Sequence, residues 1–171
     1  MTGFEILGQI LGGVAVILGF VSFQMKSARK ILMFEIATAT IFSLHYLCLG
    51  AWTAVALNSL SIVQCTAYFL REKSGKKGKT LPLVFTVLIV LSGILTWEGW
   101  HSLLIVSGLA VYSVSMASSN PRFIRFAMLY KSPACLLYNL LVWSIGGVLY
   151  EAAVLTSSVI GLIKYKNKQE S

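Results

Sequence analysis

The connection Arg71-Glu72-Lys73-Ser74-Gly75-Lys76-Lys77-Gly78-Lys79 separates two long apolar segments and decides how the chain is arranged. Counting outward from it, every second connection carries positive charge, as residues 26–30 do before it and residues 122–125 and 164–168 do after it. The connections in between contain no Lys or Arg; they are residues 49–51, 98–100 and 144–146. Cytoplasmic loops of membrane proteins retain Lys and Arg, so this alternation predicts an N-terminus outside and a C-terminus in the cytosol.

The composition supports an all-α membrane protein embedded in a lipid bilayer. Hydrophobic residues make up 57% of the chain and charged residues only 12%, and the mean hydropathy is +0.80. A helix that rises ~1.5 Å per residue crosses a ~30 Å hydrocarbon layer in about 20 residues. Seven apolar segments have about this length: Phe4–Met25, Ile31–Leu49, Trp52–Leu70, Leu81–Trp97, Ser102–Ser118, Phe123–Trp143 and Gly146–Ile163. We therefore predict seven transmembrane helices.

A shift of 93 positions lays the first three segments over the last three. The signs of the loops and the lengths of the segments agree under this one shift, and it aligns pairs such as Glu5 with Glu98 and Ser22 with Ser115. We predict a single domain over residues 1–171, with repeat one at 4–70, a linker helix at 81–97 and repeat two at 98–164. Three helices plus one linker give parallel repeats, related by an axis along the membrane normal. An alternative without the linker span would place one basic set outside.

Three charged side chains lie inside predicted spans. By the helical rise, Glu35 lies about 6 Å from the cytosolic boundary, Lys131 about 13 Å and Glu151 about 22 Å. A charge at the centre of a span costs about 2.5 to 3.5 kcal/mol on insertion scales, so these groups need partners or a hydrated cavity. Lys131 lies between two acids in depth, and Glu35 is a candidate charge partner for it beside Glu151.

The repeat aligns the polar positions in pairs and predicts a shared cavity. Under the shift Thr38 matches Lys131, His45 matches Tyr138 and Asn58 matches Glu151. The spacings place the members of each repeat on one helix face, and a central cavity is the simplest destination for both faces. The candidate substrate-binding residues are therefore Asn58, Glu151, Lys131, His45, Tyr138 and Thr38.

Each of these positions also has a structural interpretation. Asn58 can hold helices together, because small and polar residues favour close packing. His45 can be a satisfied group near the outer boundary, and Glu35 can extend to the cytosolic interface. Pro133 removes a backbone donor and frees the carbonyl of Leu129, which indicates either a hinge or a static kink.

Other classes of function find little support in the sequence. The net charge of +8 lies mainly in the predicted cytosolic loops, where orientation and anionic lipid explain it without nucleic acid. No motif for a metalloprotease, a serine hydrolase or a phosphate loop occurs, so we expect no enzyme, catalytic residue, metal or cofactor. The first apolar segment is too long for a signal peptide. The oligomeric state stays open, a homo-oligomer included.

The stretch Ser144-Ile145-Gly146-Gly147-Val148-Leu149-Tyr150-Glu151 resembles the YgjV family of small bacterial inner-membrane proteins, which has a similar element before its last span. The stretch His45–Ala51, followed by Asn58, also resembles that family, and the similarity runs over most of the chain. This resemblance implies the bacterial inner membrane as the location.

A more distant resemblance is to the SWEET and PQ-loop carriers and the PnuC vitamin-precursor transporters, which share the three-one-three plan. In SWEET carriers an Asn pair on the third and seventh helices faces the sugar. Asn58 matches the first of the pair, whereas position 151 is Glu, which favours a cationic or proton-coupled substrate over a neutral sugar.

Two functions follow as hypotheses. In the first, the protein is a transporter or facilitator that binds an unidentified small polar solute near Asn58 and Glu151 while the two repeats rock around it. In the second, it is a scaffold or accessory subunit whose polar residues only hold helices together.

Overall fold

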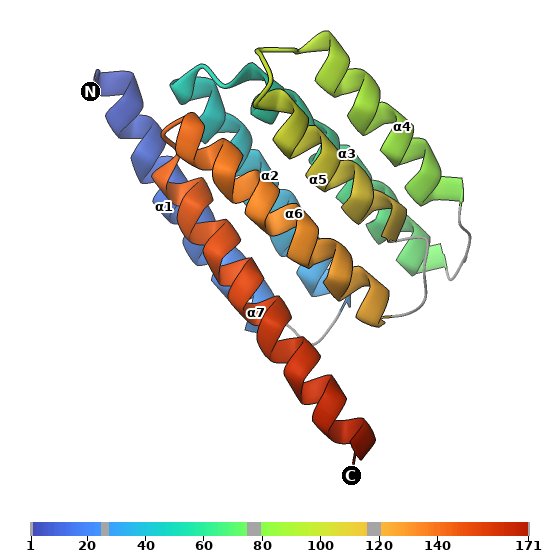
Figure 1. Cartoon of the computed structure of the whole chain (residues 1–171). Helices are drawn as coiled ribbons and strands as arrows, with labels where there is room; N and C mark the ends of the chain where they lie inside the picture. Colours follow the sequence, from blue (N-terminus) through green and yellow to red (C-terminus); the bar gives the residue numbers. More distant parts are fainter. Residues whose placement is uncertain (1, 25–27, 75–79, 116–120, 171) are drawn as a thin grey trace.

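The computed structural model describes residues 2–24, 28–74, 80–115 and 121–170 of the chain, and these form seven α-helices (Figure 1). The helices are α1 (Gly3–Gln24), α2 (Ala28–Leu49), α3 (Trp52–Ser74), α4 (Thr80–Leu95), α5 (Ser102–Ser115), α6 (Pro121–Leu141) and α7 (Ile145–Glu170). They coincide with the seven apolar segments of the sequence. The largest difference is at the end of α7, which extends past its neighbours in Figure 1.

Within the described part of the chain, three helices are long and apolar enough to cross a membrane by length and composition. These segments are Gly3–Ser22, Leu32–Leu49 and Trp52–Arg71. Three shorter apolar helical segments follow among the described residues, at Thr80–Leu95, Ser102–Ser115 and Ile145–Ile160. The architecture is thus all-helical, as expected, with three clear candidate spans in its N-terminal half.

Each helix runs antiparallel to the one before it, so the bundle has two chemically different ends (Figure 1). We call one the basic end, because it holds the start of α2, the last turn of α3 with Arg71 and Lys73, the start of α6 and the end of α7. We call the other the turn end. It holds the start of α1 and the short connections 50–51, 96–101 and 142–144.

The packing order of the helices is a ring. In one half α2 lies between α1 and α3, and in the other α6 lies between α5 and α7. The halves meet where α7 packs against α1 and where α3 contacts α4 and α5. At the first junction the helices approach closely, since a Cβ atom on Gly146 would lie 2.6 Å from the backbone of Gly12.

The α2–α3 and α6–α7 turns share one geometry at positions 93 apart. Gly50 has a φ of 71°, and its counterpart Trp143 has a φ of 55°, although left-handed conformations are unusual for residues other than Gly. After each, a backbone N–H bonds a carbonyl five residues earlier: Ala51 N to Tyr46 O at 3.0 Å and Ser144 N to Asn139 O at 2.9 Å.

Side chains from the opposite half cap the helices that follow these turns. The carboxylate of Glu98, just before α5, accepts hydrogen bonds from the N–H groups of Trp52 at 2.8 Å and Thr53 at 3.0 Å. At α7, the side-chain oxygen of Gln9 accepts the N–H of Ile145 at 3.2 Å. The first N–H groups of a helix have no partner within it, so these contacts satisfy them and join the two halves at the turn end.

Candidate functional site

A cavity of about 630 Å³ lies inside the bundle and is lined by side chains from all seven helices. This volume is within the range of pockets that hold small ligands. Four of the sequence-predicted binding residues line it, Thr38, Asn58, Lys131 and Glu151, together with the candidate charge partner Glu35. The cavity therefore brings together predicted side chains from α2, α3, α6 and α7.

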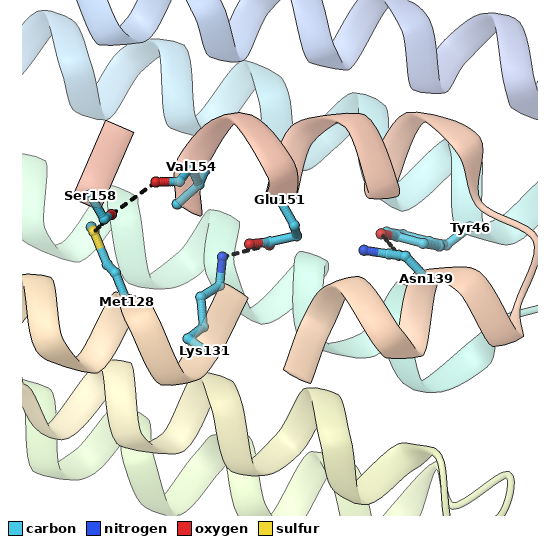
Figure 2. A network of polar contacts seen from close by, with 7 residues as sticks. All are labelled: Tyr46, Met128, Lys131, Asn139, Glu151, Val154 and Ser158. Carbon is cyan, nitrogen blue, oxygen red and sulfur yellow. Dashed lines mark hydrogen bonds and ion pairs between the residues drawn. The ribbon is translucent and has the colours of Figure 1, made fainter. Parts of the chain in front are cut away.

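The centre of the site is an ion pair between α6 and α7. The Nζ atom of Lys131 lies 2.6 Å from Oε1 of Glu151, and both side chains are largely buried (Figure 2). A charge taken out of water on its own costs several kcal/mol, so each group depends on the other. Gly108 of α5 gives this segment of α6 room, because a Cβ there would lie 3.3 Å from the backbone of Lys131.

Glu35 lies nearer the basic end and has a different partner. Its Oε1 atom accepts a hydrogen bond from the hydroxyl of Ser22 at 3.1 Å, across the α1–α2 interface. Both residues line the cavity. The carboxylate is thus turned inward, and Lys131 bonds Glu151, the deeper of its two predicted acidic partners.

Three cavity-lining residues have a buried polar atom without a hydrogen-bond partner among the described residues. These atoms are Oγ1 of Thr38, whose residue is 3% exposed, Oε2 of Glu151, whose residue is 6% exposed, and the hydroxyl of Tyr68, whose residue is 6% exposed. Buried polar groups are nearly always hydrogen-bonded, because an unsatisfied one costs about 1–3 kcal/mol. Each of these atoms thus belongs to a residue that lines the cavity, and the atom itself makes no hydrogen bond to the described part of the chain.

Asn58 also lines the cavity, with its amide placed by its own helix. The Nδ2 atom donates to the carbonyl of Ala54 one turn earlier, at 2.9 Å. Ser61 bonds Leu57 in the same way, at 2.9 Å. Neither of these bonds joins two helices.

Aromatic side chains form much of the remaining wall. Phe42 stacks on Tyr46, with ring centroids 5.8 Å apart, and meets Tyr150 edge to face at 5.3 Å. The ammonium of Lys131 lies 6.0 Å from the ring centroid of Tyr150. Tyr150 in turn packs over Gly19 of α1, where a Cβ would collide with the ring.

A layer of hydrogen bonds lies at the side of the cavity nearest the turn end. The hydroxyl of Tyr46 donates to Oδ1 of Asn139 at 2.6 Å, and both side chains are buried (Figure 2). These are the lining residues of α2 and α6 nearest the turn end. Behind them, the hydroxyl of Thr53 approaches that of Ser102 at 3.1 Å and donates to the carbonyl of Thr96.

Two predicted binding residues lie outside the cavity, in the packed layer at the turn end. The ring nitrogens of His45 contact the carbonyl of Gly8 and the hydroxyl of Ser144, each at 2.6 Å. Tyr138 is fully buried, with its ring 5.8 Å from that of His101. The hydroxyl of Tyr138 has no hydrogen-bond partner among the described residues, but neither Tyr138 nor His45 lines the cavity, so we leave both out of the proposed binding site. The alternative interpretation of His45 as a satisfied boundary group fits these contacts.

Pro133, the candidate hinge, lies within α6, which continues through it to Leu141. It is exposed on the side of the helix away from the cavity lining. A hinge at this position stays a prediction.

Three residues of the site, Ser22, Tyr46 and Asn139, are not among those predicted from the sequence. A signal for two of them was present, because Tyr46 and Asn139 directly follow the paired positions 45 and 138 and match under the same shift. Ser22 was aligned with Ser115 without a role, and its contact with Glu35 depends on how α1 packs against α2.

Comparison with known proteins gives one match. A family model described as a bacterial inner membrane protein, Imp-YgjV, matches residues 6–169. No curated protein and no solved structure matched the chain. Because the family match covers nearly all 171 residues, the chain belongs to the YgjV family of bacterial inner membrane proteins.

Proposed function

We propose that this protein is a transporter or facilitator that moves a small polar solute across the bacterial inner membrane. The observation that carries the proposal is the cavity of about 630 Å³ with a buried Lys131–Glu151 pair in its wall. Ionisable groups inside a membrane are costly, and they commonly mark solute or ion pathways.

The architecture that we propose is two parallel three-helix repeats, α1–α3 and α5–α7, joined by α4. Three observations support it. The α2–α3 and α6–α7 turns have the same geometry 93 residues apart. Each helix after these turns is capped from the opposite half. A two-fold axis between the repeats would exchange α1 with α5 and α3 with α7. It would therefore relate the contact of α1 with α7 to the contact of α3 with α5, and both contacts occur.

We propose that all seven helices cross the membrane, with the basic end in the cytosol. Lys and Arg residues are retained in cytoplasmic loops, and the helix termini next to the basic connections all lie at one end of the bundle (Figure 1). The turn-end layer with Tyr46 and Asn139 would then close the cavity toward the outside, and rocking of the two repeats would open it.

Uptake by proteoliposomes tests the proposal even though the solute is unidentified. Purified full-length protein is reconstituted and exposed to a defined mixture of sugars, nucleosides, amino acids and primary amines, and the contents are quantified by mass spectrometry. We expect at least one solute to accumulate above the level of empty liposomes. Glu151→Gln should abolish this uptake.

Glu5→Gln is the matched control for that substitution. Glu5 lies at the start of α1, where its carboxylate accepts the N–H of Thr2 at 2.9 Å and the hydroxyl of Thr2 accepts the N–H of Glu5 at 3.3 Å. Gln preserves such a capping pair while removing one negative charge, so uptake should be retained. If the protein is a scaffold, which is the second candidate function, neither the unmodified protein nor the Glu5→Gln variant should accumulate any solute.

A further inference from the structure

The cavity carries an uneven set of charges. Among the described residues that line it, the acidic side chains are Glu35 and Glu151 and the basic one is Lys131. Lys131 contacts Oε1 of Glu151 directly, whereas Glu35 is held by the neutral hydroxyl of Ser22. The lining thus holds two carboxyl groups and one amine, and the amine contacts only one of the two. An ionised Glu35 would need compensation here, and a ligand with one positive charge would supply it.

The unpaired oxygen of Glu151 indicates which chemical group of the ligand carries the positive charge. Oε2 of Glu151 is buried and has no donor among the described residues, although the other oxygen of the same carboxylate is bonded to Lys131. A carboxylate oxygen only accepts hydrogen bonds, so its natural partner is an N–H or O–H group of the ligand. An ammonium N–H supplies both the donor and the missing charge, in a charge-assisted bond.

The aromatic wall suits the same ligand. Phe42, Tyr46 and Tyr150 form a cluster of rings beside the ion pair. Aromatic faces attract cations and also bury apolar groups. We infer that the cavity binds a small primary ammonium ion with an apolar or aromatic body, whose N–H group bonds Oε2 of Glu151. This inference rests on the proposed function, in that it names the class of solute for the same cavity.

A series of ligands with one body and different charges tests the inference. Isothermal titration of the full-length protein in nanodiscs compares 2-phenylethylamine, the neutral 2-phenylethanol and the anion phenylacetate at neutral pH. We expect the amine to bind at least about tenfold more tightly than the alcohol, equivalent to ~1.4 kcal/mol. The N,N,N-trimethyl derivative keeps the charge but lacks N–H groups, so it should bind more weakly than the primary amine. Equal affinities across the series, or a preference for phenylacetate, would overturn the inference.

Three variants assign the effect to the cavity. Glu151→Gln should remove the preference for the amine over the alcohol, whereas Glu5→Gln, at the turn end, should retain it. If Glu151→Gln does not fold, Glu35→Gln provides the test, since it removes one negative charge and leaves the Lys131 pair intact. That variant should weaken amine binding and leave alcohol binding unchanged, and an unchanged preference would contradict the charge argument.

The outcomes separate this inference from the proposed function. If amines bind with the expected preference but no solute enters proteoliposomes, the ligand class stands and transport is wrong. If a neutral or anionic solute is taken up and amines do not bind, transport stands and the ligand class is wrong.

Discussion

The hydroxyl of Tyr46 donates a hydrogen bond of 2.6 Å to Asn139, a residue one repeat shift of 93 positions away. Residues related by a two-fold axis can touch each other only where they lie on that axis. A direct bond between two counterparts is therefore what we would expect if an axis ran between α2 and α6. The same two residues line the cavity at its turn-end side, so the proposed symmetry axis and the proposed gate coincide.

Tyr46→Phe should destabilise this contact without changing the shape of the side chain. The substitution leaves Oδ1 of Asn139 buried without its donor, and an unsatisfied buried acceptor costs about 1–3 kcal/mol. We expect a loss of that size in the free energy of unfolding, measured by titration with sodium dodecyl sulfate in mixed micelles. Tyr130→Phe is the control, because Tyr130 is exposed and its hydroxyl makes a longer bond of 3.3 Å to Ser107. Equal effects of the two variants would contradict the assigned role.

Thr38→Val separates binding from folding. Its hydroxyl is buried in the cavity wall and has no partner among the described residues, so the fold gains nothing from it. Replacing it with a methyl group of similar size should leave the free energy of unfolding unchanged or raise it by about 1 kcal/mol, while binding of the solute weakens. The control is Thr40→Val on the exposed side of α2, where the hydroxyl bonds Ile36 of the same helix. There, binding should not change.

Lys131 and Glu151 should behave as one unit in a double-mutant cycle. Lys131→Met leaves the carboxylate of Glu151 buried beside an apolar side chain, and breaking a buried pair in this way costs about 3–5 kcal/mol. The double variant Lys131→Met, Glu151→Gln removes both charges. Its loss in the free energy of unfolding should therefore be smaller than the sum of the losses of the two single variants. The free energies are measured by the same unfolding titration. Additive losses would mean that the 2.6 Å contact contributes little.

The sequence predicted the helices well because its apolar segments are long and its breaks are sharp. It also placed Lys131 between two acids in depth, which the spacing along each helix determines. It did not predict which acid is the partner, because depth leaves the rotation of each helix open. The structure resolves this rotation: Lys131 faces α7, and Glu35 faces Ser22 of α1.

His45 shows a second limit of the sequence argument. Sharing a helix face with Thr38 suggested that both side chains would reach one cavity. Two helical turns separate them, however, and at the level of His45 that face meets Gly8 of α1 and Ser144 before α7. Contacts between helices far apart in the chain decide whether a polar face is open or packed, and one repeat alone does not contain that information.

Gly50→Ala should destabilise the protein, whereas Gly13→Ala should stabilise it. Gly50 has a φ of 71° in the α2–α3 turn, a conformation that costs an L-residue with a side chain about 1 kcal/mol. Gly13 lies in the middle of α1, and a Cβ atom added to it would have no atom of another described helix within 4 Å. Ala there should add about 0.5–1 kcal/mol of stability through helix propensity. Unfolding titrations of both variants measure the two changes in the free energy of unfolding, which should have opposite signs. A lower stability of both variants would contradict the prediction for Gly13.

Access to the cavity from both sides of the membrane distinguishes a carrier from a scaffold. The test uses a variant in which Cys48, Cys65 and Cys135 are replaced by Ala and Ser61→Cys places one thiol in the cavity wall. The reagent is 2-(trimethylammonium)ethyl methanethiosulfonate, which does not cross membranes. Val63→Cys is the control, because Val63 is 58% exposed on another face of α3 and a thiol facing lipid stays protonated and unreactive.

A carrier predicts that Ser61→Cys reacts in vesicles of either orientation, while Val63→Cys reacts in neither. Reaction from the side of the turn end should be the slower of the two, because the Tyr46–Asn139 bond closes that route. Adding Tyr46→Phe should accelerate the reaction from the turn end. The substitution removes a hydrogen bond that only the closed arrangement makes, so it shifts the equilibrium toward the open one. If Ser61→Cys stays unreactive from the turn end even with Tyr46→Phe, the layer is static, and the protein does not alternate between two open states.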